Sequence, residues 1–191
     1  MERFNIINNL IEKNKYKSYL EIGTQHGNAF RNIDIPYKIC VDPVKEFVDL
    51  THEMTSDEFF EQNNETFDII FVDGMHTEEQ ATIDIVNSLK VLNKNGSIVV
   101  HDCLPHCEEF TSIRCNGTVF RSIIDLRYNN PDIEIFVVDT DNGCGVLKRG
   151  KQTLYTKVNI ELAKTYDYFV SDRDELMNVI SPDDFLKKYV N

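Results

Sequence analysis

Short apolar runs alternate with amphipathic segments along most of the chain. Apolar residues recur at helical spacing over residues 4–14, and a run with strand character follows at 18–22. Further runs of this strand type lie at residues 38–42, 67–72, 97–100, 133–138 and 146–147. Continuous apolar runs rich in β-branched and aromatic residues are typical of strands covered on both faces. The pattern therefore predicts an α/β fold in which a parallel sheet lies between helices.

The clearest unit spans residues 67–102, which read as strand, polar turn, helix, turn and strand. The first strand leads into Asp73, with His76 three residues further on, and the second leads into His101 and Asp102. Two parallel strands joined by a right-handed helical crossover end side by side, at the edge where open α/β sheets bind ligands. We therefore expect these four polar side chains to converge on one cleft.

His76 lies just before a predicted helix, because Thr77 and Gln80 have the spacing of a capping box. The positive end of a helix disfavours an imidazolium ion, and a neutral imidazole is suited to act as a general base near neutral pH. A histidine at a helix start can equally be solvated or structural. The neighbouring Asp73 and Asp102 favour the catalytic interpretation.

Two carboxylates on one cleft repel each other unless a proton or a cation lies between them. Oxygen ligands with open positions suit a hard cation such as Mg²⁺, which binds a substrate hydroxyl and lowers its pKa. Asp73 and Asp102 would hold this ion, and His76 would remove the hydroxyl proton.

The first strand and the turn after it carry Glu21, Gly23 and Gly27. Glycines at a strand end let the backbone approach a ligand closely, although such pairs are also common in ordinary turns. The spacing is neither the GxGxxG of dinucleotide-binding folds nor a phosphate loop ending in Gly-Lys-Ser/Thr. A ligand that carries an amino group and a sugar fits Glu21. Asp42, about twenty residues further on, suits a ribose diol, or alternatively only caps a turn before Pro43.

These residues resemble the class I S-adenosylmethionine-dependent methyltransferases. Glu21-Ile22-Gly23-Thr24-Gln25-His26-Gly27 matches that family's first motif, E/D-x-G-x-x-x-G, and Asp42 matches its ribose-binding acid. The resemblance implies a Rossmann-like fold: a mostly parallel seven-stranded sheet with helices on both faces and an antiparallel final strand.

The same resemblance implies that S-adenosylmethionine is the cofactor. Its methionine end would lie on the first loop, at Glu21, Gly23, Thr24 and Gly27. Ser56 and Asp57 would lie near the adenine. Alternatively they form a plain capping turn, with Ser56 as the N-cap of the next helix.

Around the second pair of strand ends the resemblance is narrower. Phe71-Val72-Asp73-Gly74-Met75-His76 and Val99-Val100-His101-Asp102 resemble the metal-dependent O-methyltransferases that modify sugars on macrolide antibiotics, and glycan-associated bacterial methyltransferases. In the macrolide enzymes the positions of Asp73 and Asp102 bind magnesium, and the position of His76 is the base. They carry Glu-Asp where this chain has His101-Asp102, so His101 would replace a carboxylate ligand. Imidazole is a poorer ligand for Mg²⁺, which leaves Mn²⁺, a metal-free site, or His101 as a second acid/base group as alternatives.

Composition narrows the functional classes. The 191 residues suggest one domain, and the formal charge of −12, from 20 Lys and Arg against 32 Asp and Glu, would repel a nucleic acid. No apolar run reaches about 18 residues and the first residues form no apolar signal core, so we expect no membrane span and a cytoplasmic location. The five cysteines lack CxxC spacing and are expected to be reduced thiols.

The remaining segments are less specific. Residues 104–116 predict an irregular loop that overhangs the cleft, where loops commonly carry substrate contacts. Residues 151–191 predict a mostly helical C-terminal extension, with a helix beginning after Ser181. Its aromatic residues favour packing or a homodimer contact over covering of the substrate; they are Tyr155, Tyr166, Tyr168 and Phe169.

We therefore expect a methyltransferase that acts on a hydroxyl of a small molecule or saccharide, with metal assistance and His76 as base. The preference for a sugar, a glycan precursor or a glycosylated compound rests on the resemblance alone. One alternative is a metal-independent methyltransferase that uses His76 or His101 as base. The other is a non-catalytic, cofactor-binding regulatory or assembly subunit.

Overall fold

The computed structural model describes residues 1–190, in which helices and strands alternate along the chain. The strands are β1 (Ser18–Ile22), β2 (Tyr37–Asp42), β3 (His52–Glu53), β4 (Phe67–Val72), β5 (Leu92–Val100), β6 (Ile133–Val138), β7 (Cys144–Arg149) and β8 (Val179–Ile180). The helices are α1 (Arg3–Asn14), α2 (Asn28–Arg31), α3 (Ser56–Gln62), α4 (Glu78–Val91), α5 (Val119–Asn129), α6 (Ile160–Ala163), α7 (Tyr166–Leu176) and α8 (Pro182–Phe185). A 3₁₀ turn covers Glu108–Thr111, and a π turn covers Leu186–Val190.

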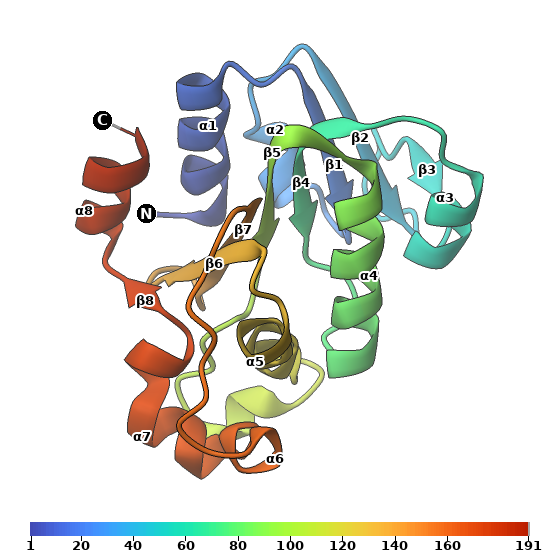
Figure 1. Cartoon of the computed structure of the whole chain (residues 1–191). Coiled ribbons are helices and arrows are strands. Elements are labelled where there is room, and N and C mark those ends of the chain that lie inside the picture. The colour runs from blue at the N-terminus through green and yellow to red at the C-terminus, as the bar shows by residue number, and fades with distance from the viewer. Residues whose placement is uncertain (191) are drawn as a thin grey trace.

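All strands join one sheet in the order β3-β2-β1-β4-β5-β7-β6-β8 (Figure 1). Only β7 runs antiparallel to its neighbours, which are β5 and β6. The predicted α/β fold and its antiparallel strand are confirmed. The sheet has one strand more than the expected seven within residues 1–190, because the two-residue β8 of the C-terminal extension pairs with β6.

Apolar side chains on the two faces of the sheet form two separate clusters. On β1, Tyr19 faces one cluster and Leu20 the other, as the alternation of a strand requires. The Tyr19 cluster includes residues of α1, α2 and α8, and the Leu20 cluster includes residues of α3, α4, α5 and α7. Helices therefore cover both faces, which explains why the strands read as continuous apolar runs.

Strand register brings the carboxyl ends of β1, β4 and β5 to one level. Val72 pairs with Ile22 on one side and with Val100 on the other. Two further backbone bonds continue the ladders past the strand ends: the amide of Asp73 donates to the Ile22 carbonyl (2.9 Å), and that of His101 donates to the Val72 carbonyl (3.0 Å). The residues that follow these strands are therefore neighbours in space, as the crossover predicted.

Two helix starts differ from the sequence prediction. The N-cap of α3 is Thr55, whose hydroxyl accepts from the Glu58 amide in a complete capping box, so Ser56 is the first helical residue. At α4, Thr77 is the N-cap and accepts from the Gln80 amide, but Gln80 does not return its side chain to complete a box. The side-chain amide of Gln80 instead contacts Ser56 and Asp57 at the start of α3.

The C-terminal extension packs against the body of the protein. Phe169 on α7 is fully buried and lies with its ring centroid 4.8 Å from that of Phe120 on α5, and Tyr155 is also buried. Ser181 caps α8 by accepting from the Asp184 amide, with Pro182 as the first helical residue, as predicted. Among residues 1–190, the helices are all too short or too polar to cross a membrane.

Candidate active site

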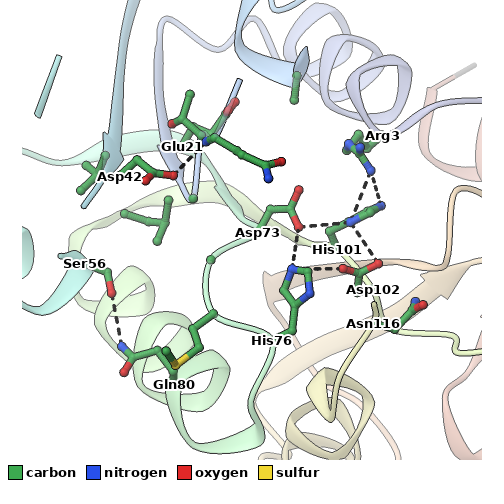
Figure 2. Close-up of a pocket in the computed structure, with 18 of the residues that line it drawn as sticks. Arg3, Glu21, Asp42, Ser56, Asp73, His76, Gln80, His101, Asp102 and Asn116 are labelled. Atoms are coloured by element: carbon green, nitrogen blue, oxygen red, sulfur yellow. Dashed lines mark hydrogen bonds and ion pairs between the residues drawn. The ribbon is translucent and has the colours of Figure 1, made fainter. Parts of the chain in front are cut away.

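One cleft of about 1030 Å³ opens at the carboxyl ends of the central strands. Its walls come from the segments after β1, β2, β4 and β5, from residues 110–116, and from the turn between β6 and β7. Glu21 and Asp42 lie toward one end, and Asp73, His76, His101 and Asp102 lie toward the other (Figure 2). The four polar residues predicted to converge do so.

Glu21 is buried in the wall of the cleft, where the Tyr19 hydroxyl donates to one of its carboxylate oxygens. Burial raises the pKa of Glu21 to about 8, against the lowering effect of that hydrogen bond. A carboxyl in this setting becomes ionised when a cationic group arrives. Glu21 is therefore suited to receive an ammonium group, such as the one at the methionine end of S-adenosylmethionine.

The glycines of the first turn are required by packing. Gly23 has φ +82°, and a Cβ on it would lie 2.0 Å from the backbone oxygen of Asp73, so only glycine lets the two turns touch. Gly27 has φ +75° and faces the ring of Phe47 instead of lining the cleft. The expected direct contact of Gly27 with the cofactor is therefore not supported: the space freed by its missing side chain is filled by an aromatic ring.

Thr24 shows where a ligand group fits this turn. Its Oγ1 is buried without a hydrogen-bond partner among the described residues, and the residue lines the cleft. The thiol of Cys40 is its one weak polar neighbour. A buried hydroxyl without a partner is unfavourable by about 1–3 kcal/mol, so a polar group of a bound ligand would stabilise it.

Asp42 and the start of α3 complete this end of the cleft. Asp42 accepts backbone hydrogen bonds from Gln25 (2.8 Å) and Val44 (2.9 Å), one on each oxygen, and each oxygen retains a free lone pair. Ser56 and Asp57 also line the cleft, and the Gln80 side-chain amide lies 3.2 Å from an oxygen of each. The predicted ribose and adenine residues thus face one volume, and Gln80 fixes two of them from α4.

Three potential ligands meet at the other end of the cleft. The Nε2 atom of His76 lies 3.3 Å from an oxygen of Asp102 and 3.6 Å from an oxygen of Asp73. Atoms of the three side chains that could bind a metal all lie within 4.8 Å of one another. Asp102 has φ +62°, a left-handed conformation, and its carboxylate lies 3.3 Å from His76 and 3.2 Å from His101.

A segment distant in sequence fixes the orientation of His76. Its Nδ1 is hydrogen-bonded to the carbonyl of Cys115, and its own carbonyl accepts from the Thr118 amide (3.0 Å). A Cβ on Gly117, which has φ +60°, would lie 1.8 Å from that carbonyl oxygen, so this segment packs directly on His76. Because a carbonyl only accepts, the Nδ1 atom carries the proton and Nε2 faces the two carboxylates.

His101 contacts the same carboxylates from the opposite side. Its Nδ1 lies 3.2 Å from oxygens of Asp73 and Asp102, while its Nε2 lies 2.6 Å from Nη1 of Arg3 and 3.4 Å from Asp141. Both ring nitrogens therefore contact protein groups. This arrangement differs from the expectation that His101 is a metal ligand, because a nitrogen that donates its proton to a carboxylate has no free lone pair.

Charge and burial compete in this cluster. Burial raises the pKa of Asp73, but the contacts with His101, His76 and Arg3 outweigh burial and hold that pKa well below its usual range. The hydrogen bond to Asp73 raises the pKa of His76, aided by the charge of Asp102 and opposed by burial. The two carboxylates therefore act against the effect of the helix end, which favours a neutral His76 by about 0.3–1 kcal/mol.

The protonation of His101 is set by opposing contacts. Burial disfavours the charged form of His101, whereas the carboxylates around the ring raise its pKa. A guanidinium only donates, so the 2.6 Å contact makes Nε2 the acceptor of a hydrogen bond from Arg3. The ring proton is therefore assigned to Nδ1 from the hydrogen-bond network.

Known proteins resemble the part of the chain that carries the cleft. Residues 20–103, which contain the first motif and the strand ends at Asp42, Asp73 and Asp102, match the family model described as "Methyltransferase domain". This segment therefore has the sequence pattern of a methyltransferase domain. No curated protein matches the chain.

Solved methyltransferase structures share the fold. The O-methyltransferase TomG of Streptomyces achromogenes, in complex with SAM, has 15% identity and a TM-score of 0.58, with 76% of this chain and 78% of that chain covered. The O-methyltransferase from Bacillus cereus, in complex with SAH, has 14% identity and a TM-score of 0.59, with 77% and 80% covered. SAH-bound PaMTH1 of Podospora anserina has 15% identity and a TM-score of 0.57, with 79% and 80% covered. At this identity the likeness establishes the fold alone.

Several residues of the cleft were not assigned a role from the sequence. Arg3 and Asp141 contact His101, Gln80 reaches Ser56 and Asp57, and Asn116 is buried beside the cluster (Figure 2). A partial signal existed for the turn that holds Asp141, since its run of Asp, Asn and Gly residues is typical of left-handed backbone. Asp141, Asn142 and Gly143 all have positive φ. No local pattern connects Arg3 with a histidine almost a hundred residues away.

Proposed function

We propose that this protein transfers the methyl group of S-adenosylmethionine to a hydroxyl of a small molecule or saccharide, with divalent-metal assistance. The whole chain would act as a single domain, with residues 151–191 as a helical extension. The observation that carries the proposal is the convergence of Asp73, His76 and Asp102 within 4.8 Å of one another, at the end of the cleft away from Asp42. The O-methyltransferases that share this fold support the choice of oxygen as acceptor atom.

The cofactor end needs four kinds of contact, and the residues present fit them. Glu21 would receive the ammonium group, Thr24 and the backbone near Gly23 would contact the methionine end, and Asp42 would accept from the ribose hydroxyls. Ser56 and Asp57 would lie near the adenine, held by Gln80. The sulfonium of S-adenosylmethionine supplies an activated methyl group, so the protein has mainly to align the acceptor oxygen with it.

The two carboxylates suit a hard cation such as Mg²⁺, and an imidazole as an added ligand suits Mn²⁺ better. Such an ion, held by Asp73 and Asp102, would lower the pKa of an acceptor hydroxyl. His76, oriented by the Cys115 carbonyl, presents Nε2 to take the hydroxyl proton. The same geometry also suits His76 as a third metal ligand. Replacing His76 lowers metal affinity if it is a ligand and leaves metal affinity unchanged if it is only the base.

His101 is better suited to positioning than to ligation. Its Nδ1 holds Asp73 and Asp102 at 3.2 Å each, and Arg3 and Asp141 orient the ring from behind. These contacts also favour a second candidate, a metal-independent methyltransferase. In that case Arg3 and His101 would balance the carboxylates without an ion, and His76 would act alone as base.

Calorimetric titration tests the proposal. SAH and S-adenosylmethionine should bind with and without metal, and a separate Mg²⁺ or Mn²⁺ signal should disappear in Asp73→Asn. Cofactor binding without any metal signal, together with turnover in the presence of EDTA, would establish the metal-independent candidate. Failure of both cofactors to bind would contradict the proposed function altogether.

A further inference from the structure

The acceptor end of the cleft has an apolar wall. Met75, in the turn before α4, is 59% exposed, and Ile113 is 56% exposed, although both line the cleft. Phe110 is half-buried and also lines the cleft. Exposed large apolar side chains gathered at a cleft mouth mark a surface that a ligand covers.

Arg114 stands out among the charged residues of the cleft. Most charged residues in the lining are acidic, and the only Arg or Lys side chains among the described lining residues are Arg3 and Arg114. Arg3 is engaged by Asp141 (3.2 Å) and by His101. Arg114 is exposed, and no described residue forms an ion pair or hydrogen bond with its side chain.

The backbone around Arg114 is held in one place. The Gly117 amide lies within hydrogen-bonding distance of the carbonyls of Phe110 (3.1 Å) and Ser112 (3.0 Å), and the Cys115 amide donates to Ser112 (2.9 Å). The far end of this closed turn is the segment that packs on His76. A guanidinium is therefore carried on a fixed loop, one residue before the carbonyl that orients the proposed base.

We propose that the acceptor carries an anionic group, a phosphate or a carboxylate, which Arg114 binds while Met75, Phe110 and Ile113 cover an apolar or ring portion of the same molecule. This inference rests on the proposed function and specifies its substrate class. A guanidinium fork binds a carboxylate or phosphate through two parallel hydrogen bonds. In a chain with a formal charge of −12, an unpaired arginine inside an acidic cleft gives local selectivity for an anion that the overall field would repel.

Matched acceptor pairs test this inference. Glucose 6-phosphate is compared with glucose, and 4-hydroxyphenylacetate with 4-hydroxyphenylacetamide, so that each pair differs in charge on one scaffold. Binding to the SAH complex with Mg²⁺ is followed by ligand-observed NMR, and methyl transfer by radiolabel from S-adenosylmethionine. The proteins are the wild type, Arg114→Gln, and the control Lys94→Gln, which removes one exposed charge at the amino end of β5.

We expect the anionic member of at least one pair to bind more tightly to the wild type. In Arg114→Gln that affinity should fall about 10- to 100-fold, the range of a hydrogen bond between charged groups, while the neutral member and Lys94→Gln remain unchanged. Arg114→Lys should restore part of the preference.

Three results would overturn the inference: equal binding of both members, no binding of either, or an anion preference that survives in Arg114→Gln. The last result would assign the preference to the metal. Calorimetry with SAH distinguishes a failure of the inferred substrate class from a failure of the proposed function. If SAH binds and the charge preference is absent, only the substrate class fails; if SAH does not bind, the proposed function fails.

Discussion

The two ends of the cleft are built in different ways. At the cofactor end, Glu21 lies in β1, Thr24 follows β1, and Asp42 ends β2. The pairing of two neighbouring parallel strands therefore positions all three residues. At the acceptor end, β4 and β5 supply Asp73 and Asp102, but their surroundings come from distant segments: α1, residues 110–118 and the β6–β7 turn. Parallel strand ends thus supply one part of the cleft by themselves, whereas the surroundings of Asp73 and Asp102 depend on long-range packing.

The largest effect is expected from the carboxylates of the acceptor end. Asp102→Asn and Asp73→Asn should reduce methyl transfer to background and remove metal binding, because each loses a charged ligand. Asparagine tolerates the left-handed backbone of Asp102, so this change tests the charge and not the turn. Radiolabel transfer, with SAH calorimetry as control, checks the result. Loss of SAH affinity in these variants would show that the two ends are not separate.

His76→Ala should reduce turnover by about 10²–10⁴-fold if His76 is the base. SAH affinity should stay near that of the wild type, because the side chain lies at the acceptor end. Metal titration sharpens the result: unchanged metal affinity assigns His76 as base, and reduced affinity assigns it as ligand. Turnover equal to the wild type would remove His76 from the mechanism.

The raised pKa of Glu21 predicts that both stability and cofactor affinity depend on pH. Because its folded-state pKa is raised to about 8, the protein without ligand binds more protons folded than unfolded between its ordinary pKa and pH 8. Stability contributed by this group is therefore present at low pH and lost as pH rises toward 8. Affinity for the cationic amino group should move the other way, rising with pH by at most about tenfold per unit below pH 8.

Calorimetry of SAH from pH 6 to pH 9, with Glu21→Gln as the matched variant, measures this dependence. Glu21→Gln should bind weakly and without the slope. A flat profile in the wild type would place the amino group elsewhere in the cleft.

The smallest effect is expected from Asp42→Asn. The amide keeps an oxygen for one backbone donor but loses one acceptor position, which corresponds to about 1–3 kcal/mol or roughly a 5- to 100-fold loss of SAH affinity. Turnover at saturating cofactor should remain, since Asp42 does not face the acceptor. A fall in saturated turnover would show that ribose contacts also align the methyl group.

The difference between the two ends also explains what the sequence alone could predict. Strand ends at Asp42, Asp73 and Asp102 follow from apolar periodicity and parallel topology, and the structure confirms that Asp73, His76, His101 and Asp102 converge. The role of Gly27 was not predictable, since local sequence does not indicate that Phe47 fills the space beside it. The partners of His101 were not predictable either: Arg3 is 98 residues away in the sequence, and Asp141 lies in the distant β6–β7 turn.

Residues 115–118 pack on His76, and this contact affects which parts of the cleft mouth can vary in sequence. Cys115 contacts the ring of His76, and Thr118 contacts its backbone. Both residues come after the stretch that carries Phe110, Ile113 and Arg114. Insertions, deletions or exchanges in that stretch can therefore remodel the pocket mouth while the imidazole keeps its orientation. Residues 106–114 can therefore vary while residues 115–118 keep His76 in place. This makes residues 106–114 the natural target for changing acceptor choice by library selection.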